Sequence, residues 1–467
     1  MIFSSIDYFI FFIIVILSLI TIKSNKYKKV FLFLASYFFY SYWDFRFTIL
    51  MFSMTLATYF IGLKIENSSD DKVRKNWLIT GLIFNLSILG VFKYYNFFID
   101  SANVVIENIG IRLPFLEIIL PIGISFITFE LISYTIDIFR RDIRSPKAFI
   151  DLGLLVSFFP HLIAGPILKP REFIPQLQRD IVITWGNIEK GLQLFIIGLI
   201  KKILIADRLA LFVDPVFASP NNYNSGTIWL AVIAYTLQIF CDFSGYTDMA
   251  IGSAKCLGFD IPRNFNMPYI SKSITEFWRR WHISLSTWLR EYLYIPLGGN
   301  RKGKARQYIN LVIVMLLGGL WHGASWNFVL WGGFQGLGLA IHKYYVDNIR
   351  TPKEKDSFMY NFICWLLTML FVCVGWVLFR TTNVSQSMII LSKLFFIGEI
   401  DGVAWYSTSI LIIVPIVIIS HIVGSKVKEP YYFKLNNFTG MFVLLFILLG
   451  ILFLTPVYSS PFIYFQF

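Results

Sequence analysis

The stretch LLGGLWHGASWNFVLWGGFQG, Leu316 to Gly336, is apolar enough to lie in a membrane, yet it carries the imidazole of His322 near its middle. The whole chain shares this character, because 56% of its 467 residues are hydrophobic, only 15% are charged and the mean hydropathy is +0.65. Runs of about 18 or more apolar residues predict membrane-spanning helices, and the chain contains many of them. The sequence therefore predicts an all-α polytopic membrane protein.

The predicted spans number about 10 to 12 and are expected to form a single domain over residues 1–467. Their approximate positions are 5–22, 30–42, 45–63, 77–98, 118–139, 186–206, 227–251, 308–342 (long enough for two helices), 358–379, 405–424 and 437–458. The apolar segment 148–168 is interrupted by Pro160 and Pro166. Segment 262–306 is too charged to face lipid and too rich in Trp and Leu for a free loop. It predicts short helices that enter the membrane partway from the cytoplasmic side.

The formal net charge of +13 arises mainly from basic residues in short loops between the spans. The positive-inside rule accounts for this pattern, so we expect lipid headgroups as partners and no nucleic acid. The Lys cluster at 23–29 and the segment 140–147 are predicted to face the cytoplasm. The segment 99–117 and the N-terminus are predicted to face outside. The first apolar run has no basic n-region and no small-residue cleavage site, which argues against a cleaved signal peptide.

Several common catalytic motifs do not occur in the sequence. There is no GxxxxGK[ST], HExxH or GxSxG, so ATP hydrolysis, zinc proteolysis and an α/β-hydrolase triad have no support. The four cysteines form no CxxC pair and lie in or beside apolar segments, which predicts reduced core residues and no metal site.

His322 is the first candidate for chemistry. A neutral imidazole is far cheaper to bury than a fixed charge, so both a packed, hydrogen-bonded ring and a working one fit this position. If 308–330 is one helix, His322 lies near its middle or at a break at Gly318 and Gly319. Glycines four residues apart, a spacing that lets helices approach closely, occur at Gly319/Gly323 and Gly332/Gly336.

A second histidine, His282, lies in EFWRRWHISLSTW, where helical spacing predicts that Trp278, His282 and Ser286 share one face. An interfacial aromatic-and-basic belt and a wet, positive pocket both fit this segment. Glu291 is the one acid among seven basic residues, Arg279, Arg280, Arg290, Arg301, Lys302, Lys304 and Arg306. Such a surface attracts phosphorylated ligands, for example coenzyme A or a phosphopantetheine arm.

Carboxylates inside apolar segments are the third set of candidates. They are Asp242 and Asp248 in CDFSGYTDMAIG, and Glu130 and Asp137 in PIGISFITFELISYTIDIFR. Intramembrane carboxylates are functional candidates by default, although a structural partnership with a buried Arg or His fits equally. We expect Asp248, together with Glu276 and Glu291, to hold the arginines in place.

Seven stretches, taken together and in order, resemble the membrane-bound O-acyltransferase family: IFSS, PIGISF, FFPHLIAGPI, CDFSGYTDMAIG, NFNMPY, FWRRWHISLSTWLREYLYIPLGGNR and GGLWHGASWNFVLWGGFQG. They span about residues 2–336, with a motif-bearing core at about 118–345, whereas 358–467 holds only further spans. The resemblance is greatest to the bacterial branch of alginate and peptidoglycan O-acetyltransferase membrane subunits. YIPLGGNR favours that branch over the more distant teichoic-acid D-alanyl transfer subunits.

The resemblance implies a helical bundle with re-entrant helices around a central tunnel, in the cytoplasmic (inner) membrane of a bacterium. It implies an acyl thioester donor, acetyl-CoA or a carrier-bound acyl group, that enters from the cytoplasm as substrate, with no bound cofactor. It also implies an extracytoplasmic polysaccharide acceptor and a secreted or periplasmic acyltransferase as partner.

The family's signature histidine corresponds to His322 and its second histidine to His282. We predict His322 as the general base and His282 as a group that orients the thioester or stabilises the oxyanion. Two residues depart from the branch, which usually has Gln at the positions of Glu130 and His161. The predicted substrate-binding residues are Trp278, Arg279, Arg280, Asn300, Arg301, Trp321, Asp242, Tyr246 and Asp248.

Three alternatives remain open at this level. A transporter or flippase explains the intramembrane carboxylates but not the Trp-His-Gly motif, and no inverted halves are visible in the sequence. A non-catalytic subunit that only recruits a secreted acyltransferase is the second. The third is a D-alanyl-transfer subunit of the teichoic-acid type.

Overall fold

The computed structural model describes residues 1–107, 110–350, 357–398, 400–427, 437–454 and 462–463. Within these residues the chain is helical, and its one β-bridge, Tyr223 with Val403, forms no strand. The chain divides into two compact units, each described by itself. Unit 1 comprises Met1–Ile197 and Tyr246–Pro262, and unit 2 comprises Gly198–Gly245 and Arg263–Phe467. The expectation of a single domain stays a prediction.

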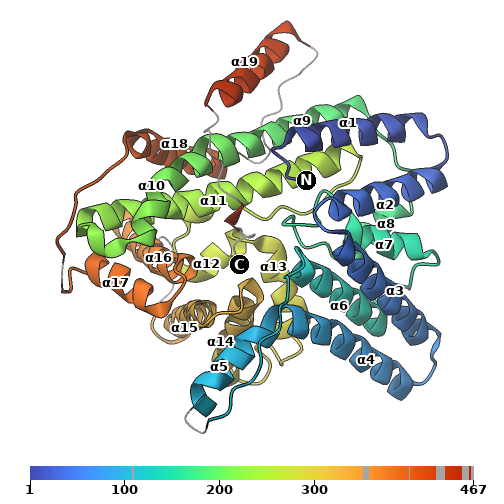
Figure 1. The fold of residues 1–467 in the computed structure, drawn as a ribbon, viewed down its shortest axis with the longest axis horizontal. Helices are drawn as coiled ribbons and strands as arrows, with labels where there is room; N and C mark the ends of the chain where they lie inside the picture. Colours follow the sequence, from blue (N-terminus) through green and yellow to red (C-terminus); the bar gives the residue numbers. More distant parts are fainter. Residues whose placement is uncertain (108–109, 351–356, 399, 428–436, 455–461, 464–467) are drawn as a thin grey trace. The chain divides into compact units, whose positions relative to one another are not determined.

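Unit 1 contains the first helices of the chain, of which α3, α4 and α6 lie side by side (Figure 1). Three of its helices begin at capped residues: Ser5 accepts a hydrogen bond from the Tyr8 amide, Asp44 accepts one from the Arg46 amide, and Asp70 accepts one from the Lys72 amide. The elements are α1 (Ile6–Thr21), α2 (Asn25–Ser41), α3 (Phe45–Asn67), α4 (Asp71–Leu89), η1 (Gly90–Tyr94), α5 (Tyr95–Ile106), α6 (Ile124–Arg140), α7 (Phe149–Ser157), α8 (Pro170–Leu177) and α9 (Trp185–Leu199, whose end lies in unit 2).

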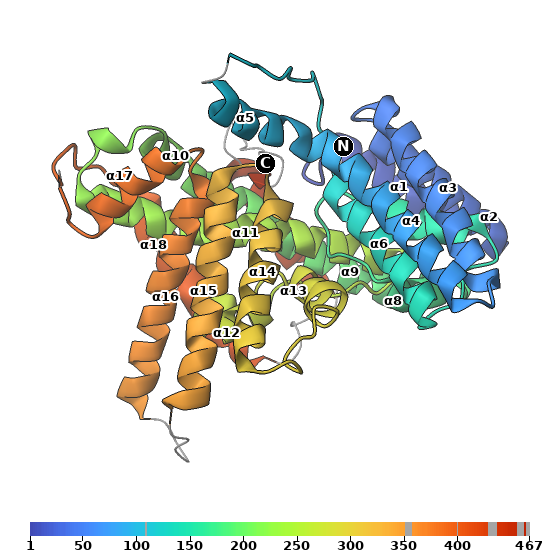
Figure 2. The ribbon, with the colours of Figure 1, turned by 90° about the horizontal axis from the view of Figure 1, so that it is seen from below.

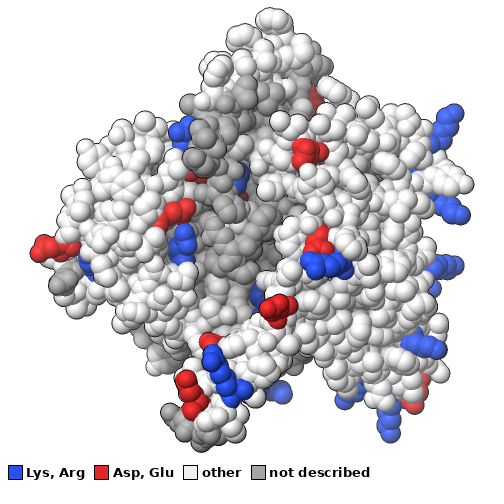
Figure 3. All heavy atoms as spheres, in the orientation of Figure 1, with Lys and Arg blue, Asp and Glu red and all other residues white. Residues whose placement is uncertain are grey.

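Hydrogen bonds join the basic loops of unit 1 at one edge of the unit. Arg74 near the start of α4 donates a hydrogen bond of 2.9 Å to the carbonyl oxygen of Phe139 near the end of α6. The Ser145 amide after α6 donates one of 3.1 Å to Glu66 near the end of α3. Figure 3 shows Lys and Arg side chains along this edge and mainly uncharged atoms over the neighbouring helices. The predicted cytoplasmic orientation of segment 140–147 stays a prediction.

Unit 2 contains the segments with both candidate histidines, and α14, α15 and α16 lie side by side in it (Figure 2). Its elements are η3 (Ile200–Ala206), α10 (Asp207–Ala218), η4 (Pro220–Asn222), α11 (Ser225–Cys256, whose end lies in unit 1), η5 (Pro268–Ile270), α12 (Ile274–Arg280), α13 (Ile283–Leu289), η6 (Arg290–Tyr294), α14 (Lys304–His322), α15 (Trp326–Asn348), α16 (Phe358–Arg380), α17 (Val384–Leu394), α18 (Thr408–Lys426) and α19 (Phe438–Leu454).

Each predicted span contains helix in the structure, and 308–342 is two helices, α14 and α15. Residues 118–123 precede α6 and are not helical, and residues 455–458 of the last predicted span lie outside the described residues. The prediction of short helices in 262–306 is confirmed by α12 and α13. In the part of the chain that the structure describes, five helices are long and apolar enough to cross a membrane. They are Phe45–Asn67, Asp71–Ile106, Ser225–Cys256, Phe358–Arg380 and Thr408–Lys426.

The expected position of His322 within its helix is wrong. His322 is the last residue of α14, and α15 begins at Trp326, so the chain breaks after the histidine and not at Gly318 and Gly319. Gly319 stays helical because it packs against α15, where a Cβ on it would collide with the Phe328 carbonyl oxygen. The predicted close approach through small residues is therefore confirmed.

Candidate active site

His282 and His322 come together in unit 2. Their ring centroids lie 6.3 Å apart with an interplanar angle of 61°. Both side chains are buried, with 0% of His282 and 6% of His322 exposed. Forty positions separate them in the sequence, and they come from the start of α13 and the end of α14. The structure thus brings together the two residues predicted to carry the chemistry.

Aromatic rings from four helices enclose the two imidazoles. Trp321 lies 5.0 Å from the His322 ring and 5.9 Å from the His282 ring, between centroids. Phe243 of α11 contacts His282 edge-on at 4.7 Å. His322 is flanked by Trp331 of α15 and Phe379 of α16, at 5.1 and 5.2 Å. These walls exclude water from the imidazoles and so strengthen electrostatic interactions there.

The backbone at His282 contradicts the prediction that Trp278, His282 and Ser286 share one helical face. Helix α12 ends at Arg280, and His282 adopts the left-handed conformation (φ 41°, ψ 56°) before α13 begins. A left-handed residue other than glycine costs about 1–2 kcal/mol. Periodicity fails here because the chain turns at the histidine, and such turns are a recurrent feature of functional sites.

Trp278 and Trp321, both predicted to bind substrate, are packed in unit 2. The Trp278 indole N–H donates a hydrogen bond of 3.1 Å to the Gln335 side-chain oxygen and lies against the Trp331 ring at 5.8 Å. Trp321 is buried and contacts both imidazoles. Trp278 therefore supports the histidine cage through Trp331, whereas Trp321 belongs to the cage itself. Their direct contact with substrate stays a prediction.

The basic segment is largely exposed on unit 2. Arg279 is exposed, whereas Arg280 is half-buried and forms a salt bridge of 3.0 Å with Glu276, which confirms that Glu276 holds an arginine. The remaining exposed members are Arg290, Asn300, Arg301, Lys302, Lys304 and Arg306. Exposed guanidinium and ammonium groups are accessible to an anionic ligand, so the predicted donor-binding role is sterically open to them.

Asp242 is engaged in a buried ion network. The Lys202 ammonium lies 2.7 Å from a carboxylate oxygen of Asp242 and 2.8 Å from one of Asp207. The Ile463 amide donates a hydrogen bond of 2.8 Å to the other Asp242 oxygen. These contacts give Asp242 a structural role, and its substrate-binding role stays a prediction. Sequence reasoning missed Lys202, although a Lys-Lys pair inside the apolar segment 186–206 was a visible signal.

Tyr246 and Asp248, the other predicted substrate-binding residues, belong to unit 1. Tyr246 is buried, and its ring stacks on Phe3 with a centroid distance of 4.6 Å. Asp248 is half-buried. Both roles stay predictions.

Glu130 and His161, which the resemblance predicts to depart from the family pattern, are in contact. His161 Nδ1 lies 3.3 Å from Glu130 Oε1, and both side chains are 1% exposed. His161 Nε2 lies 2.9 Å from the Leu155 carbonyl oxygen near the end of α7, and the Leu168 amide donates to Glu130 at 3.2 Å. The two substitutions thus form one buried pair that joins α6 to the chain after α7.

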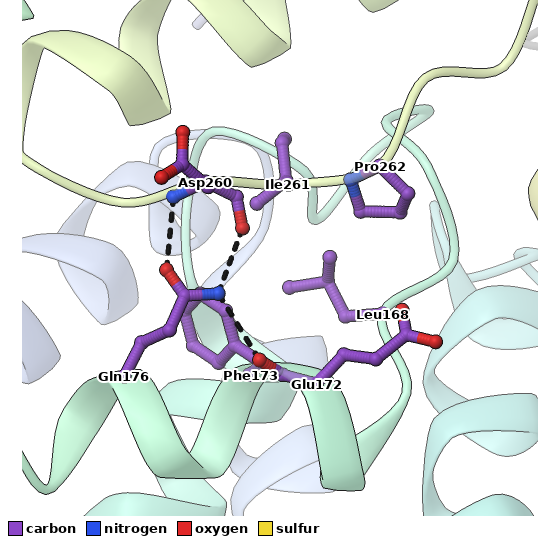
Figure 4. A pocket seen from close by; sticks show the side chains of 7 residues that line it. All are labelled: Leu168, Glu172, Phe173, Gln176, Asp260, Ile261 and Pro262. Atoms are coloured by element: carbon purple, nitrogen blue, oxygen red, sulfur yellow. Dashed lines mark hydrogen bonds between the residues drawn. The ribbon is translucent and has the colours of Figure 1, made fainter.

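A small pocket in unit 1 is lined by α8 and by residues 260–262 (Figure 4). The Gln176 side chain accepts a hydrogen bond from the Asp260 amide at 2.9 Å and donates one to its carbonyl oxygen at 2.8 Å. The volume of ≈ 240 Å³ is below the roughly 300–1,000 Å³ of typical ligand sites. Neither His282 nor His322 lines it, so it is separate from the candidate histidine site.

The described residues contain no group of three or more His, Cys, Asp or Glu side chains that could bind a metal ion. Cys241 and Cys256 are buried, Cys364 and Cys373 are half-buried, and all four are free thiols.

The comparisons with known proteins identify the class of this protein. The model of the membrane-bound O-acyltransferase family matches residues 143–384, which include His282 and His322. The chain belongs to this family, and it is a multi-pass membrane acyltransferase.

Named relatives lie in three groups. The chain is 44% identical to the probable alginate O-acetylase AlgI of Pseudomonas syringae pv. tomato over 402 residues, or 85% of this chain and 76% of the relative. It is 39% identical to the peptidoglycan O-acetyltransferase of Helicobacter pylori over 396 residues, or 79% and 74%. It is 27% identical to the teichoic acid D-alanyltransferase of Bacillus subtilis over 273 residues, or 55% and 68%.

Proposed function

We propose that this protein is the membrane O-acetyltransferase of a bacterial cell-surface polysaccharide pathway. It takes an acetyl group from a thioester on the cytoplasmic side of the inner membrane. A secreted or periplasmic acyltransferase then completes transfer to polysaccharide hydroxyls. The similarity to O-acetyltransferases of alginate and peptidoglycan, at 44% and 39% identity against 27% for the D-alanyltransferase, supports acetyl as the acyl group.

The paired histidines are the observation that carries this proposal. In the first transfer a hydroxyl group of the partner acyltransferase is the acceptor: its oxygen attacks the carbonyl carbon of the thioester, a C–O bond forms and the C–S bond breaks, and the partner then carries the acetyl ester to the polysaccharide. His322 takes the proton of the attacking hydroxyl and delivers it to the leaving thiolate. Because His322 is the last residue of α14, the helix dipole stabilises the imidazolium that forms, by about 0.3–1 kcal/mol.

His282 has a different role in the same cage. It approaches His322 from the start of α13, and its ring donates a hydrogen bond to the oxygen that gains negative charge in the tetrahedral intermediate. The aromatic walls keep both rings fixed and exclude bulk water, which limits hydrolysis of the thioester.

The basic segment supplies the donor site of this proposal. Acetyl-CoA and carrier-bound thioesters both carry phosphate, and the exposed Arg279 and Arg301 offer guanidinium groups to it. Arg280, held by Glu276, shapes the surface between them.

A gene deletion with plasmid complementation tests this function. Cell-surface polysaccharides and peptidoglycan are isolated, and ester-linked acetate and ester-linked D-alanine are measured by mass spectrometry after mild alkali. We expect acetate esters to disappear from one polymer and to return on complementation, while D-alanine esters are unchanged. Loss of D-alanine esters instead would show that the acyl group is wrong, and no change in either ester would refute the function.

A further inference from the structure

His282 begins α13 in an unusual way. A residue at this position, the N-cap, normally uses its side chain to accept a hydrogen bond from an unpaired amide in the first helical turn. The His282 side chain makes no such bond. Its ring is directed instead at Phe243 and His322, with centroids 4.7 and 6.3 Å away. The first turn of α13 therefore needs another acceptor.

Asn264 provides that acceptor from outside the helix. Its side-chain oxygen accepts hydrogen bonds from the Ser284 amide at 3.1 Å and from the Ser284 hydroxyl at 2.6 Å. Its backbone carbonyl oxygen accepts one from the Ile283 amide at 2.9 Å. Asn264 is 1% exposed, so these bonds are shielded from water. One residue thus pairs with both positions that follow His282.

The same segment also holds the chain before His282. The Asn266 amide donates a hydrogen bond of 2.9 Å to the Arg280 carbonyl oxygen. The Arg280 guanidinium donates one of 3.1 Å to the Asn266 carbonyl oxygen. Residues 264–266 therefore fix the backbone on both sides of the left-handed histidine, which has φ 41°.

We propose that Asn264 is a positioning residue for His282: it caps α13 in place of the histidine side chain and so leaves the imidazole available to the acyl-transfer site. This inference rests on the proposed function, in which His282 takes part in acyl transfer. Asn264 acts through His282 and not on the substrate.

The acceptor oxygen is the property that matters in this role. Asn264→Ala removes both side-chain bonds to Ser284, so α13 loses its cap and the His282 backbone loses its support. Asn264→Asp keeps an oxygen at the same place, and a carboxylate is favourable at a helix N-terminus. The alanine variant should therefore lose activity that the aspartate variant retains.

Asn85 in unit 1 offers a matched control. It is also fully buried and also makes two side-chain hydrogen bonds, to the Thr58 hydroxyl at 3.1 Å and the Gly81 carbonyl oxygen at 2.9 Å. Asn85→Ala therefore reproduces the loss of two buried bonds without touching α13. It measures the general effect of such a loss on activity.

The experiment uses the full chain in the deletion strain. Cells receive a pulse of radiolabelled acetate, and the initial rate of label incorporation into alkali-labile esters is divided by the amount of the protein in the membrane. We expect Asn264→Ala to lower this rate by roughly 10- to 100-fold, because small displacements of catalytic groups have effects of that size. Asn264→Asp and Asn85→Ala should stay within about threefold of wild type.

Two results would overturn the proposal: a rate for Asn264→Ala within about twofold of wild type, or equal losses in Asn264→Ala and Asn264→Asp. If Asn264→Ala does not accumulate, Ser284→Ala decides, because it removes the 2.6 Å bond to Asn264 while Asn264 itself is kept. A severalfold loss supports the proposal, and an unchanged rate overturns it. His282→Ala in the same assay distinguishes failure of this inference from failure of the proposed function. If His282→Ala stays fully active, the proposed role of His282 itself is wrong.

Discussion

The rings of His282 and His322 lie 6.3 Å apart, although the residues are forty positions apart in the chain and belong to different helices. His282 adopts the left-handed conformation at the start of α13, and His322 is the last residue of α14. Each of these two backbone features positions one imidazole. Aromatic side chains from α11, α14, α15 and α16 then keep the two rings in a common, nearly dry cage. The predictions below follow from this arrangement.

Replacement of His282 should lower activity less than replacement of His322, because another donor or water can partly replace a hydrogen bond to the oxyanion. We expect His282→Ala to reduce the rate of acetate ester formation by roughly 10²- to 10³-fold, the usual cost of one such donor. The measurement is pulse labelling in the complemented deletion strain. His342→Ala is the control, since His342 lies 2.9 Å from the Thr275 hydroxyl and, among the described residues, contacts neither histidine of the cage. Equal rates for the two variants would contradict the assignment.

Close packing of α14 on α15 should depend on Gly319 and not on Gly333. A Cβ on Gly319 would collide with the Phe328 carbonyl oxygen, whereas one on Gly333 would meet only the Leu316 side chain at 3.5 Å. Gly319→Ala should destabilise the protein by about 1–3 kcal/mol and displace His322, lowering activity as well. Gly333→Ala should be tolerated. Thermal unfolding in detergent, followed by tryptophan fluorescence, checks both. A similar shift for the two variants would show that this contact is unimportant.

Lys202 should be essential for stability, because its ammonium neutralises two buried carboxylates. Lys202→Met leaves Asp207 and Asp242 without this cation and should cost about 3–5 kcal/mol, the usual effect of removing one member of a buried ion pair. Lys201 is the matched control: its ammonium lies 5.7 Å from the Phe240 ring centroid, a contact worth about 0.5–1 kcal/mol. Membrane levels and thermal unfolding are measured for both variants. A stable Lys202→Met protein would disprove the structural role of this network.

Exposed arginines should affect donor binding more than turnover. Arg279→Gln and Arg301→Gln should each raise the donor KM severalfold, and added salt should raise the wild-type KM, because exposed charge interactions are screened. The assay uses inverted membrane vesicles and labelled acetyl-CoA. Lys64→Gln in unit 1 is the control for a general loss of surface charge. An unchanged KM in both arginine variants would leave the basic segment with an interfacial role only.

Much of the fold follows from hydropathy, because each predicted span contains helix and the charged segment 262–306 does form short helices. Spacing also predicted the glycine contacts between α14 and α15. Hydropathy windows do not register backbone turns, so they placed His322 inside a helix and His282 on a regular helical face. Hydropathy also does not show which residues far apart in the sequence are in contact. The ion network of Lys202 and the helix cap from Asn264 were missed for this reason.

The departures at Glu130 and His161 illustrate the same limit. From the resemblance they were two separate departures from the Gln expected at each position. The structure shows one buried pair, with His161 Nδ1 3.3 Å from Glu130 Oε1. Residue patterns do not show that two such buried side chains are in contact.

The most direct test of the central claim is the acetylation rate of His322→Ala, measured by pulse labelling and normalised to the protein present in the membrane. If His322 is the general base, the rate should fall by roughly 10²- to 10⁴-fold while the protein still reaches the membrane at its normal level. A variant that forms acetate esters at more than about half the wild-type rate would contradict the role of His322 and the proposed mechanism with it.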